Sequence, residues 1–256
     1  MNIEGLRVLL DEKTILYNQP DFIPSDPISI PHHFTRREDI EISGFLVATI
    51  AWGQRSTIVK NGFRMMNLMD DAPYDFVMNA GQKDLKRIDT FVHRTFNSDD
   101  LLFFLESLKS IYQNHGGLEQ AFSAGLSDGE KDVYHSIINF RRLFLENSHL
   151  IRSRKHIADP SAGSTAKRIN MYLRWMVRKD NNGVDFGLWN CISPAQLYCP
   201  LDVHVGNVAR KCGLLVRKQN DWKAVEELTA NLRVFDQNDP VKYDFALFGM
   251  GVFEKI

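Results

Sequence analysis

Apolar residues recur at helical spacing along most of this chain. Residues 38–52 are almost continuously apolar after an acidic start, which predicts a buried helix. Ser56 is a suitable N-cap for a following amphipathic helix, and residues 98–113 predict another helix with an acidic first turn. Residues 127–146 continue the pattern and open on Ser-Asp, a good capping pair. The first half of the chain is therefore predicted to be helical.

Segments that predict strands are few. Residues 18–35 contain four prolines, which favours an irregular or extended connection. The sequence has no glycine-rich phosphate loop after a strand, no nucleophile elbow and no dinucleotide-binding fingerprint. His32 and His33 lie beside a proline without a third ligand at helical spacing, which indicates a packed or solvated pair rather than a metal site. We expect an all-α protein.

The composition is that of a soluble globular protein, with 44% hydrophobic and 25% charged residues among 256. The longest apolar runs are too short to span a membrane, and the amino terminus lacks the apolar core of a signal peptide. We expect a cytoplasmic protein, in the bacterial cytosol or nucleoid, that has no membrane partner.

The three cysteines have spacings that fit no common cysteine site. Cys191, Cys199 and Cys212 are odd in number and lack the CxxC spacing of structural zinc sites and the four thiolates of an iron–sulfur cluster. We expect reduced thiols, no metal and no other cofactor.

Positive charge is concentrated in one stretch, although the net charge of the whole chain is −1. Between residues 151 and 179 the only acidic residue is Asp159, and the basic residues are Arg152, Arg154, Lys155, Lys167, Arg168, Arg174, Arg178 and Lys179. Such a patch can guide a polyanion to one face of a nearly neutral protein. A solvated helix face is the commoner explanation for a charge run.

Residues 160–164, PSAGS, form a short turn directly before a predicted helix. Gly163 can adopt a positive φ, and Ser164 can cap the helix. The first N–H groups of that helix would then be suited to binding a phosphate. A plain turn between helices is the alternative.

Lys167 follows this turn within the first helical turn. The positive end of the helix dipole lies close to it and favours the neutral, nucleophilic amine. Asn170, Met171, Arg174 and Arg178 share its face of the helix, opposite an apolar stripe. A single helical lysine is usually a solvated residue, so its position alone does not indicate catalysis.

Asp202 changes that interpretation. It follows Pro200-Leu201 at a natural N-cap position, and the helix that it opens is predicted to end at Gly213. Capping is the ordinary role of such an aspartate. If the chain turns back, however, its carboxylate lies near Lys167 and could stabilise positive charge developing on a sugar ring. His204 either faces the same site or packs.

The hairpin, the lysine helix and the PLDVH segment at residues 200–204 resemble those of the helix-hairpin-helix DNA glycosylase superfamily, especially its 8-oxoguanine branches. Over the whole chain, the sequence is similar to an uncharacterised bacterial family with GS-x-x-KR-x-NM-x-LRWMVR followed by PLD-x-H. The resemblance implies a two-lobed helical fold with a cleft between the lobes. Residues 53–165 would form the inner lobe, and residues 1–52 with 166–256 the other lobe.

The resemblance also implies roles for individual residues. Lys167 matches the nucleophile and Asp202 the essential carboxylate. Gln54, with Arg55 beside it, matches the segment that fills the gap left by a flipped base. In the helix that lines the base pocket, Asp244 matches a polar reader and Phe248 a stacking aromatic ring. The residues expected to contact DNA or its phosphates are Gly163, Ser164, Arg168, Arg174, Gln54, Arg55 and His204.

The chain departs from the superfamily pattern in two places. PSAGS replaces the usual Leu-Pro-Gly-x-Gly hairpin. The separation between Lys167 and Asp202 exceeds that of the eukaryotic-type enzymes and is nearer to that of the archaeal branch. Residues 179–199 therefore form an insertion that could shape a different pocket. The lack of a cysteine cluster agrees with the 8-oxoguanine branches.

These observations predict a DNA repair glycosylase that removes an oxidised purine such as 8-oxoguanine by base flipping and lysine Schiff-base chemistry, with or without β-lyase activity. Its partner would be double-stranded DNA with a damaged base, and no obligatory protein partner is expected. One alternative is a non-catalytic nucleic-acid-binding protein with the same fold. Another is a helical protein-interaction scaffold whose arginine face pairs with an acidic partner.

Overall fold

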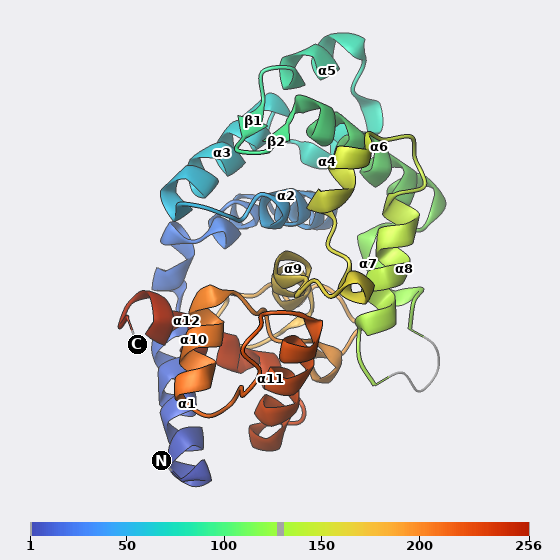
Figure 1. Cartoon of the computed structure of the whole chain (residues 1–256). Helices are drawn as coiled ribbons and strands as arrows, with labels where there is room; N and C mark the ends of the chain where they lie inside the picture. Colours follow the sequence, from blue (N-terminus) through green and yellow to red (C-terminus); the bar gives the residue numbers. More distant parts are fainter. Residues whose placement is uncertain (1, 127–130, 256) are drawn as a thin grey trace. The chain divides into compact units, whose positions relative to one another are not determined.

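A computed structural model describes residues 2–126 and 131–255 of the chain, and most of them are helical (Figure 1). In this part of the chain, the strands are limited to β1 (Val92–His93) and β2 (Phe96–Asn97), which pair antiparallel. The predicted all-α class is confirmed. None of the helices in the described ranges is long and apolar enough to cross a membrane.

The chain divides into two compact units. Unit 1 comprises residues 2–22, 131–134 and 159–255 of the described chain, and unit 2 comprises residues 23–126 and 135–158. These boundaries differ from the predicted ones at 52/53 and 165/166. Residues 23–52 lie in unit 2 because their helix packs there, and the 160–164 turn lies in unit 1 with the Lys167 helix.

Unit 1 is built around a buried carboxy-terminal helix. Its helices are α1 (Ile3–Tyr17), α9 (Lys167–Val177), α10 (Val203–Lys211), α11 (Trp222–Phe235) and α12 (Tyr243–Val252). α12 packs against both α1 and α10 (Figure 1). Gly249 makes the close approach of α1 possible, since a Cβ there would lie 2.1 Å from the Tyr17 ring.

Unit 2 has a core of phenylalanine rings. Its helices are α2 (Arg37–Thr49), α3 (Arg55–Leu68), α4 (Pro73–Asn79), α5 (Gln82–Ile88), α6 (Ser98–Asn114), α7 (Leu118–Ser123) and α8 (Tyr134–Phe144), whose first residue belongs to unit 1. Phe45 of α2 packs on Phe104 of α6 and on Phe140 and Phe144 of α8, with ring centroids 5.3–6.0 Å apart. These rings are all buried, so the predicted apolar helix near residues 38–52 does form part of a core.

Short 3-10 turns connect the helices. They are η1 (Pro20–Ser25), η2 (Pro27–Ser29), η3 (Pro31–His33), η4 (Ile151–His156), η5 (Pro160–Ala162), η6 (Pro194–Gln196) and η7 (Pro240–Lys242). Six of these seven begin with proline, whose fixed φ suits the first position of a helical turn. The proline-rich 18–35 segment is thus an irregular connection made of three such turns.

Several helix starts differ from the prediction by a few residues. α3 begins at Arg55 after Gln54, so Ser56 is inside the helix. By contrast, α6 begins at Ser98 as predicted, and Asn97 caps it by accepting the Asp100 N–H in a reciprocal capping box. α8 begins at Tyr134, and the Ser-Asp pair predicted to cap it lies outside the described residues.

Candidate functional site

Lys167 is the first residue of α9. The residue before it, Ala166, is the N-cap and has a left-handed backbone with φ 47°. The Ser164 hydroxyl accepts the Ala166 N–H at 3.2 Å, two residues before the N-cap position of the helix. The prediction that Ser164 caps α9 is therefore wrong, because the chain makes an additional turn before the helix begins.

The hairpin before α9 already holds a carboxylate of its own. Gly163 has the predicted positive φ, 86°. The Asp159 carboxylate accepts the N–H groups of Ser161 and Ala162 at 3.1 and 3.3 Å. The N–H groups of Gly163 and Ser164 donate to carbonyls within the same turn. Since these four amides are engaged, the predicted phosphate contact by the Gly163 and Ser164 backbone is not supported.

The structure brings Lys167 and Asp202 together. The distance from Lys167 Nζ to Asp202 Oδ2 is 3.8 Å, and the two side chains are 23% and 25% exposed. The amine also lies 3.6 Å from the thioether sulfur of Met171, one turn along α9. The near neighbours of the Lys167 amine are thus a carboxylate and a weakly accepting thioether sulfur.

Asp202 has the predicted capping role as well. Its side chain accepts the Val205 N–H at 3.0 Å at the start of α10. The helix ends as predicted before Gly213, where φ is 73° and the Leu214 N–H returns to the Ala209 carbonyl. The carboxylate orientation is thus fixed by a local hydrogen bond.

The loop between α10 and α11 holds Asp202 and the hairpin in place. The Asn220 side-chain amide donates to the Asp202 carbonyl at 3.3 Å, and Arg210 donates to Asn220 at 2.6 Å. At the end of the same loop, the Trp222 N–H donates to the Gly163 carbonyl at 3.1 Å. Sequence reasoning missed the two contacts to the Asp202 and Gly163 carbonyls because a main-chain acceptor leaves no sequence motif.

Arg174 of α9 and Arg178 at its carboxyl end are buried, contrary to the predicted basic face. Arg174 and Arg178 are each 4% exposed. Arg174 pairs with Asp185 at 3.2 Å and with Asp244. The prediction that Arg174 binds phosphate is therefore wrong, and neither arginine offers a surface to an acidic partner. Their charges are neutralised inside unit 1 instead.

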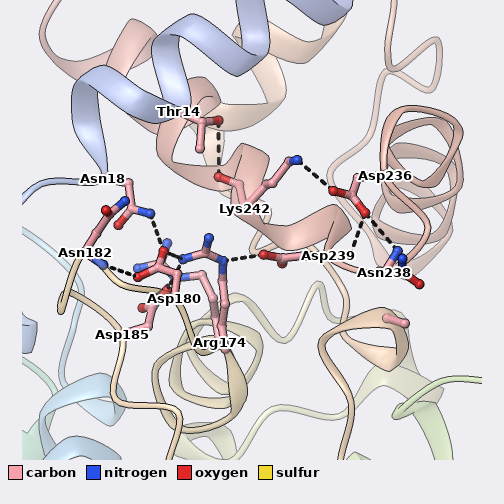
Figure 2. A network of polar contacts seen from close by, with 12 residues as sticks. Thr14, Asn18, Arg174, Asp180, Asn182, Asp185, Asp236, Asn238, Asp239 and Lys242 are labelled. Carbon is pink, nitrogen blue, oxygen red and sulfur yellow. Dashed lines mark hydrogen bonds and ion pairs between the residues drawn. The ribbon is translucent and has the colours of Figure 1, made fainter.

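The 179–199 insertion supplies two of the carboxylates around these arginines. Arg178 pairs with Asp180 at 2.6 Å and Asp185 at 3.2 Å, and with Asp239 at 2.8 Å. The Asp180 carboxylate also accepts the side-chain N–H of Asn18 at the end of α1 (Figure 2). The insertion is therefore part of the unit 1 core rather than a separate loop.

The same segment runs back along α9. The N–H groups of Phe186 and Trp189 donate to the Trp175 and Met176 carbonyls at 2.8 and 3.0 Å. Gly187 permits this path, since it has φ 57° and a Cβ there would lie 3.0 Å from the Lys179 Cα.

Asp244, the predicted polar reader, is buried in the first turn of α12. One of its oxygens receives the Arg174 guanidinium. Burial raises the pKa of Asp244 to about 6; the positive charges of Arg174 and Lys167 oppose this rise, and the negative charges of Asp202 and Asp185 add to it. Burial also raises the pKa of the Cys199 thiol, which the Asp244 charge raises further.

Three other predicted site residues belong to unit 1. Burial lowers the pKa of Arg168, in the first turn of α9, to about 10, so that it remains a cation at neutral pH. His204 is exposed on α10, where Gly251 leaves room for its Cβ. Phe248 is half-buried on α12, and its ring lies edge-on to Phe22 at 6.2 Å.

Residues 26–253 match the model of a family described as a protein of unknown function, DUF2400. The chain belongs to this family. No curated protein and no solved structure matches it. The DUF2400 match includes Lys167, Asp202 and all four carboxylates of the α9 network, and it begins after α1.

The DUF2400 region also includes the predicted gap-filling turn, in unit 2. Gln54 is exposed at the start of α3, and Gly53 before it has φ 103°. The Arg94 side chain lies over Gly53, since a Cβ there would be 2.6 Å from its Nη1. His93 contacts the Trp52 carbonyl at 3.2 Å. The β1–β2 hairpin thus braces this turn, and Arg94 adds a cation that the sequence did not indicate.

The cysteines and acidic residues of this DUF2400 protein form no evident metal centre. Cys191, Cys199 and Cys212 are free thiols. Within residues 2–126 and 131–255, no group of three or more His, Cys, Asp or Glu side chains is arranged to hold a metal ion.

Proposed function

We propose that this protein is a DNA glycosylase of the helix-hairpin-helix type that uses Lys167 as its nucleophile. The observation that carries the proposal is the 3.8 Å approach of the Lys167 amine to the Asp202 carboxylate. The resemblance of residues 160–204 to the superfamily supports it, as does the helical fold. The two-lobed arrangement and the cleft that the resemblance implies are part of the proposal.

The proposed reaction begins with a nucleotide flipped out of a DNA duplex. The neutral Lys167 amine attacks the anomeric carbon; the new C–N bond forms as the glycosidic bond breaks, and the base leaves with that electron pair and takes up a proton. The amine loses a proton, and the sugar ring opens to a Schiff base. β-Elimination from this intermediate would cleave the strand on the 3′ side.

In the proposed reaction, Asp202 stabilises the positive charge that develops on the sugar. An oxocarbenium-like sugar carries positive charge in the transition state, and a carboxylate held near the nucleophile stabilises that charge. The hydrogen bond from Val205 and the Asn220 contact with the Asp202 carbonyl limit reorientation of the group. The carboxylate is thus arranged before the reaction begins.

The substrate in this proposal is double-stranded DNA with an oxidised purine, as in the 8-oxoguanine branches. Gln54 would occupy the gap left by the flipped nucleotide, with Arg55 on the adjacent phosphate. Arg168 and His204 would contact phosphates, and Phe248 would stack on the base. Exposure of Gln54 and His204 is compatible with these contacts.

Borohydride trapping tests the proposal. Duplexes with 8-oxoguanine, uracil or an abasic site are incubated with the protein, and reduction fixes any Schiff base as a covalent adduct. We expect an adduct with the unmodified protein and none with Lys167→Ala. Lys211→Ala, an exposed lysine on α10, is the matched control and should still be trapped. An adduct that persists in Lys167→Ala, or none with any of the three duplexes, would overturn the assignment.

A further inference from the structure

Asp244 is held by the helices that carry the Lys167–Asp202 pair: it pairs with Arg174, seven residues after Lys167 on α9, and its helix packs on α10, which Asp202 caps. Asp244 reaches the same region of unit 1 from α12, and the charges of both Lys167 and Asp202 act on it. Its carboxylate is buried and held by Arg174, which is itself buried. The nucleophile site therefore includes a carboxylate that solvent does not screen.

The buried network around Asp244 carries more negative than positive charge. Two guanidinium groups, of Arg174 and Arg178, face four carboxylates. The Asp180 and Asp239 side chains are 20% and 23% exposed, so uncompensated negative charge is costliest on the two buried carboxylates, Asp185 and Asp244. Proton uptake by a carboxylate removes that cost. The carboxylates are those of Asp180, Asp185, Asp239 and Asp244.

The four carboxylates are not equivalent. Asp180 accepts hydrogen bonds from Asn18, Asn182 and Arg178, and its pKa is lowered. Burial raises the pKa of Asp185, Asp239 and Asp244. Of these three, Asp244 is the one on which both Lys167 and Asp202 act. A proton taken up by Asp244 is therefore the one that would change the electrostatic field at the Lys167–Asp202 pair.

We infer that Asp244 is a positioning residue that takes up and releases a proton next to the Lys167–Asp202 pair, and so sets the charge beside the nucleophile. Protonation of Asp244 removes one negative charge that acts on Lys167, and ionisation restores it. The groups that face Asp244 are Lys167 and Arg174 of α9, Asp202 at the start of α10, and Asp185 and Cys199 of the preceding segment. This role replaces base reading by Asp244, and its catalytic part rests on the proposed function.

The coupling between Asp244 and Lys167 is measurable without DNA. In full-length protein with 13C-labelled aspartate, the Asp244 carboxyl signal should titrate with a midpoint near pH 6. Lys167→Met removes a positive charge and should raise that midpoint, whereas Asp202→Asn removes a negative charge and should lower it. Lys167→Arg retains the charge and serves as the control. A midpoint that is the same in all four proteins overturns the inference. Because Asp244 itself is unchanged, misfolding of an Asp244 variant does not interfere.

A second measurement tests the effect on catalysis. The rate of borohydride trapping is followed from pH 5 to pH 8 in the unmodified protein, Asp244→Asn and Asp244→Glu. We expect the pH-dependent step near pH 6 to disappear in Asp244→Asn and to return in Asp244→Glu. A uniform loss of rate in Asp244→Asn with an unchanged profile would show a structural role only, and would overturn the inference. If the unmodified protein forms no adduct, the proposed function fails, and the NMR titration still decides the charge coupling.

Discussion

Lys167 and Asp202 approach to 3.8 Å although 35 residues separate them in the sequence, and each stands at the amino end of a helix. The helix dipoles of α9 and α10 place partial positive charge at both of these helix ends. Asp202 therefore serves two purposes at once. It caps α10 through the Val205 N–H and presents a carboxylate oxygen to the lysine amine.

These two purposes are separable by a single substitution. Asp202→Asn keeps an oxygen for the cap, because asparagine caps helices about as well as aspartate, so the free energy of unfolding should change by less than about 0.5 kcal/mol. The negative charge is lost, and borohydride trapping should slow by about 100-fold. Trapping kinetics and urea denaturation of the same preparations measure both effects.

Asp221→Asn is the matched control for this substitution. Asp221 caps α11 through the Ala224 N–H as Asp202 caps α10, but its carboxylate pairs with Arg217 instead of a lysine amine. Trapping should proceed in this variant as in the unmodified protein. Equal trapping rates in Asp202→Asn and Asp221→Asn would count against a catalytic carboxylate at residue 202.

The buried arginines of α9 are predicted to be essential to the fold. Arg178→Met leaves three carboxylates without their shared cation, and breaking a buried ion pair in this way costs about 3–5 kcal/mol. Arg142→Ala is the contrasting change, because its exposed pair with Glu146 should contribute no more than about 0.5 kcal/mol. Urea denaturation compares the two. Similar stabilities would mean that the network contributes little.

Stability should also depend on pH through Asp244. Its pKa is about 6 in the fold and about 3.9 in an unfolded chain, so between these values the folded protein binds more protons than the unfolded one. The free energy of unfolding should therefore decrease as the pH rises from 4 to 7, by on the order of 3 kcal/mol from this group. Asp244→Asn lacks the titration.

The measurement is the difference in unfolding free energy between Asp244→Asn and the unmodified protein at several pH values. Contributions from groups that titrate alike in both proteins cancel in this difference. As the pH rises, the free energy of unfolding of Asp244→Asn should increase relative to that of the unmodified protein. A shift in the opposite direction, or none, would contradict the raised pKa.

Local sequence patterns were sufficient for some of the fold and of the site. The apolar periodicity of residues 38–52 predicts α2 within a few residues, because a helix core depends on spacing alone. Asp202 is predictable as a cap since the hydrogen bond that it accepts comes from three residues away. Predicting that Asp202 approaches Lys167 required the superfamily pattern as well, because no local rule specifies where two helix ends meet.

The burial of Arg174 and Arg178 could not be predicted from the helix itself. Arginines spaced by four residues indicate a solvated face, and nothing within α9 shows that distant carboxylates cover it. Asp244, the partner of Arg174, is 70 residues further along the chain. The network forms through tertiary packing. The burial of the two arginines can therefore be recognised only when their carboxylate partners are known.

The hydrogen bonds that Asp159 accepts within the hairpin could be predicted in part from the sequence. Aspartate directly before a proline commonly accepts the N–H groups two or three residues later, and Asp159 stands directly before Pro160. Asp159 is also the only acidic residue of a basic run, and that composition alone does not reveal its role as a hydrogen-bond acceptor.

Asp159 therefore has a testable effect on DNA binding. Asp159→Asn keeps an acceptor for the Ser161 and Ala162 N–H groups, so stability should change by less than about 0.5 kcal/mol. Removing its negative charge from the hairpin should strengthen binding to plain duplex several-fold at low salt, and the gain should shrink as salt screens the phosphates. Fluorescence anisotropy with a labelled duplex over a range of salt concentrations measures this. Glu12→Gln on α1 changes the net charge equally and is the control. If the two variants gain affinity equally, the hairpin does not lie near DNA; if only Asp159→Asn gains, its carboxylate opposes a phosphate at the position that the superfamily resemblance predicts.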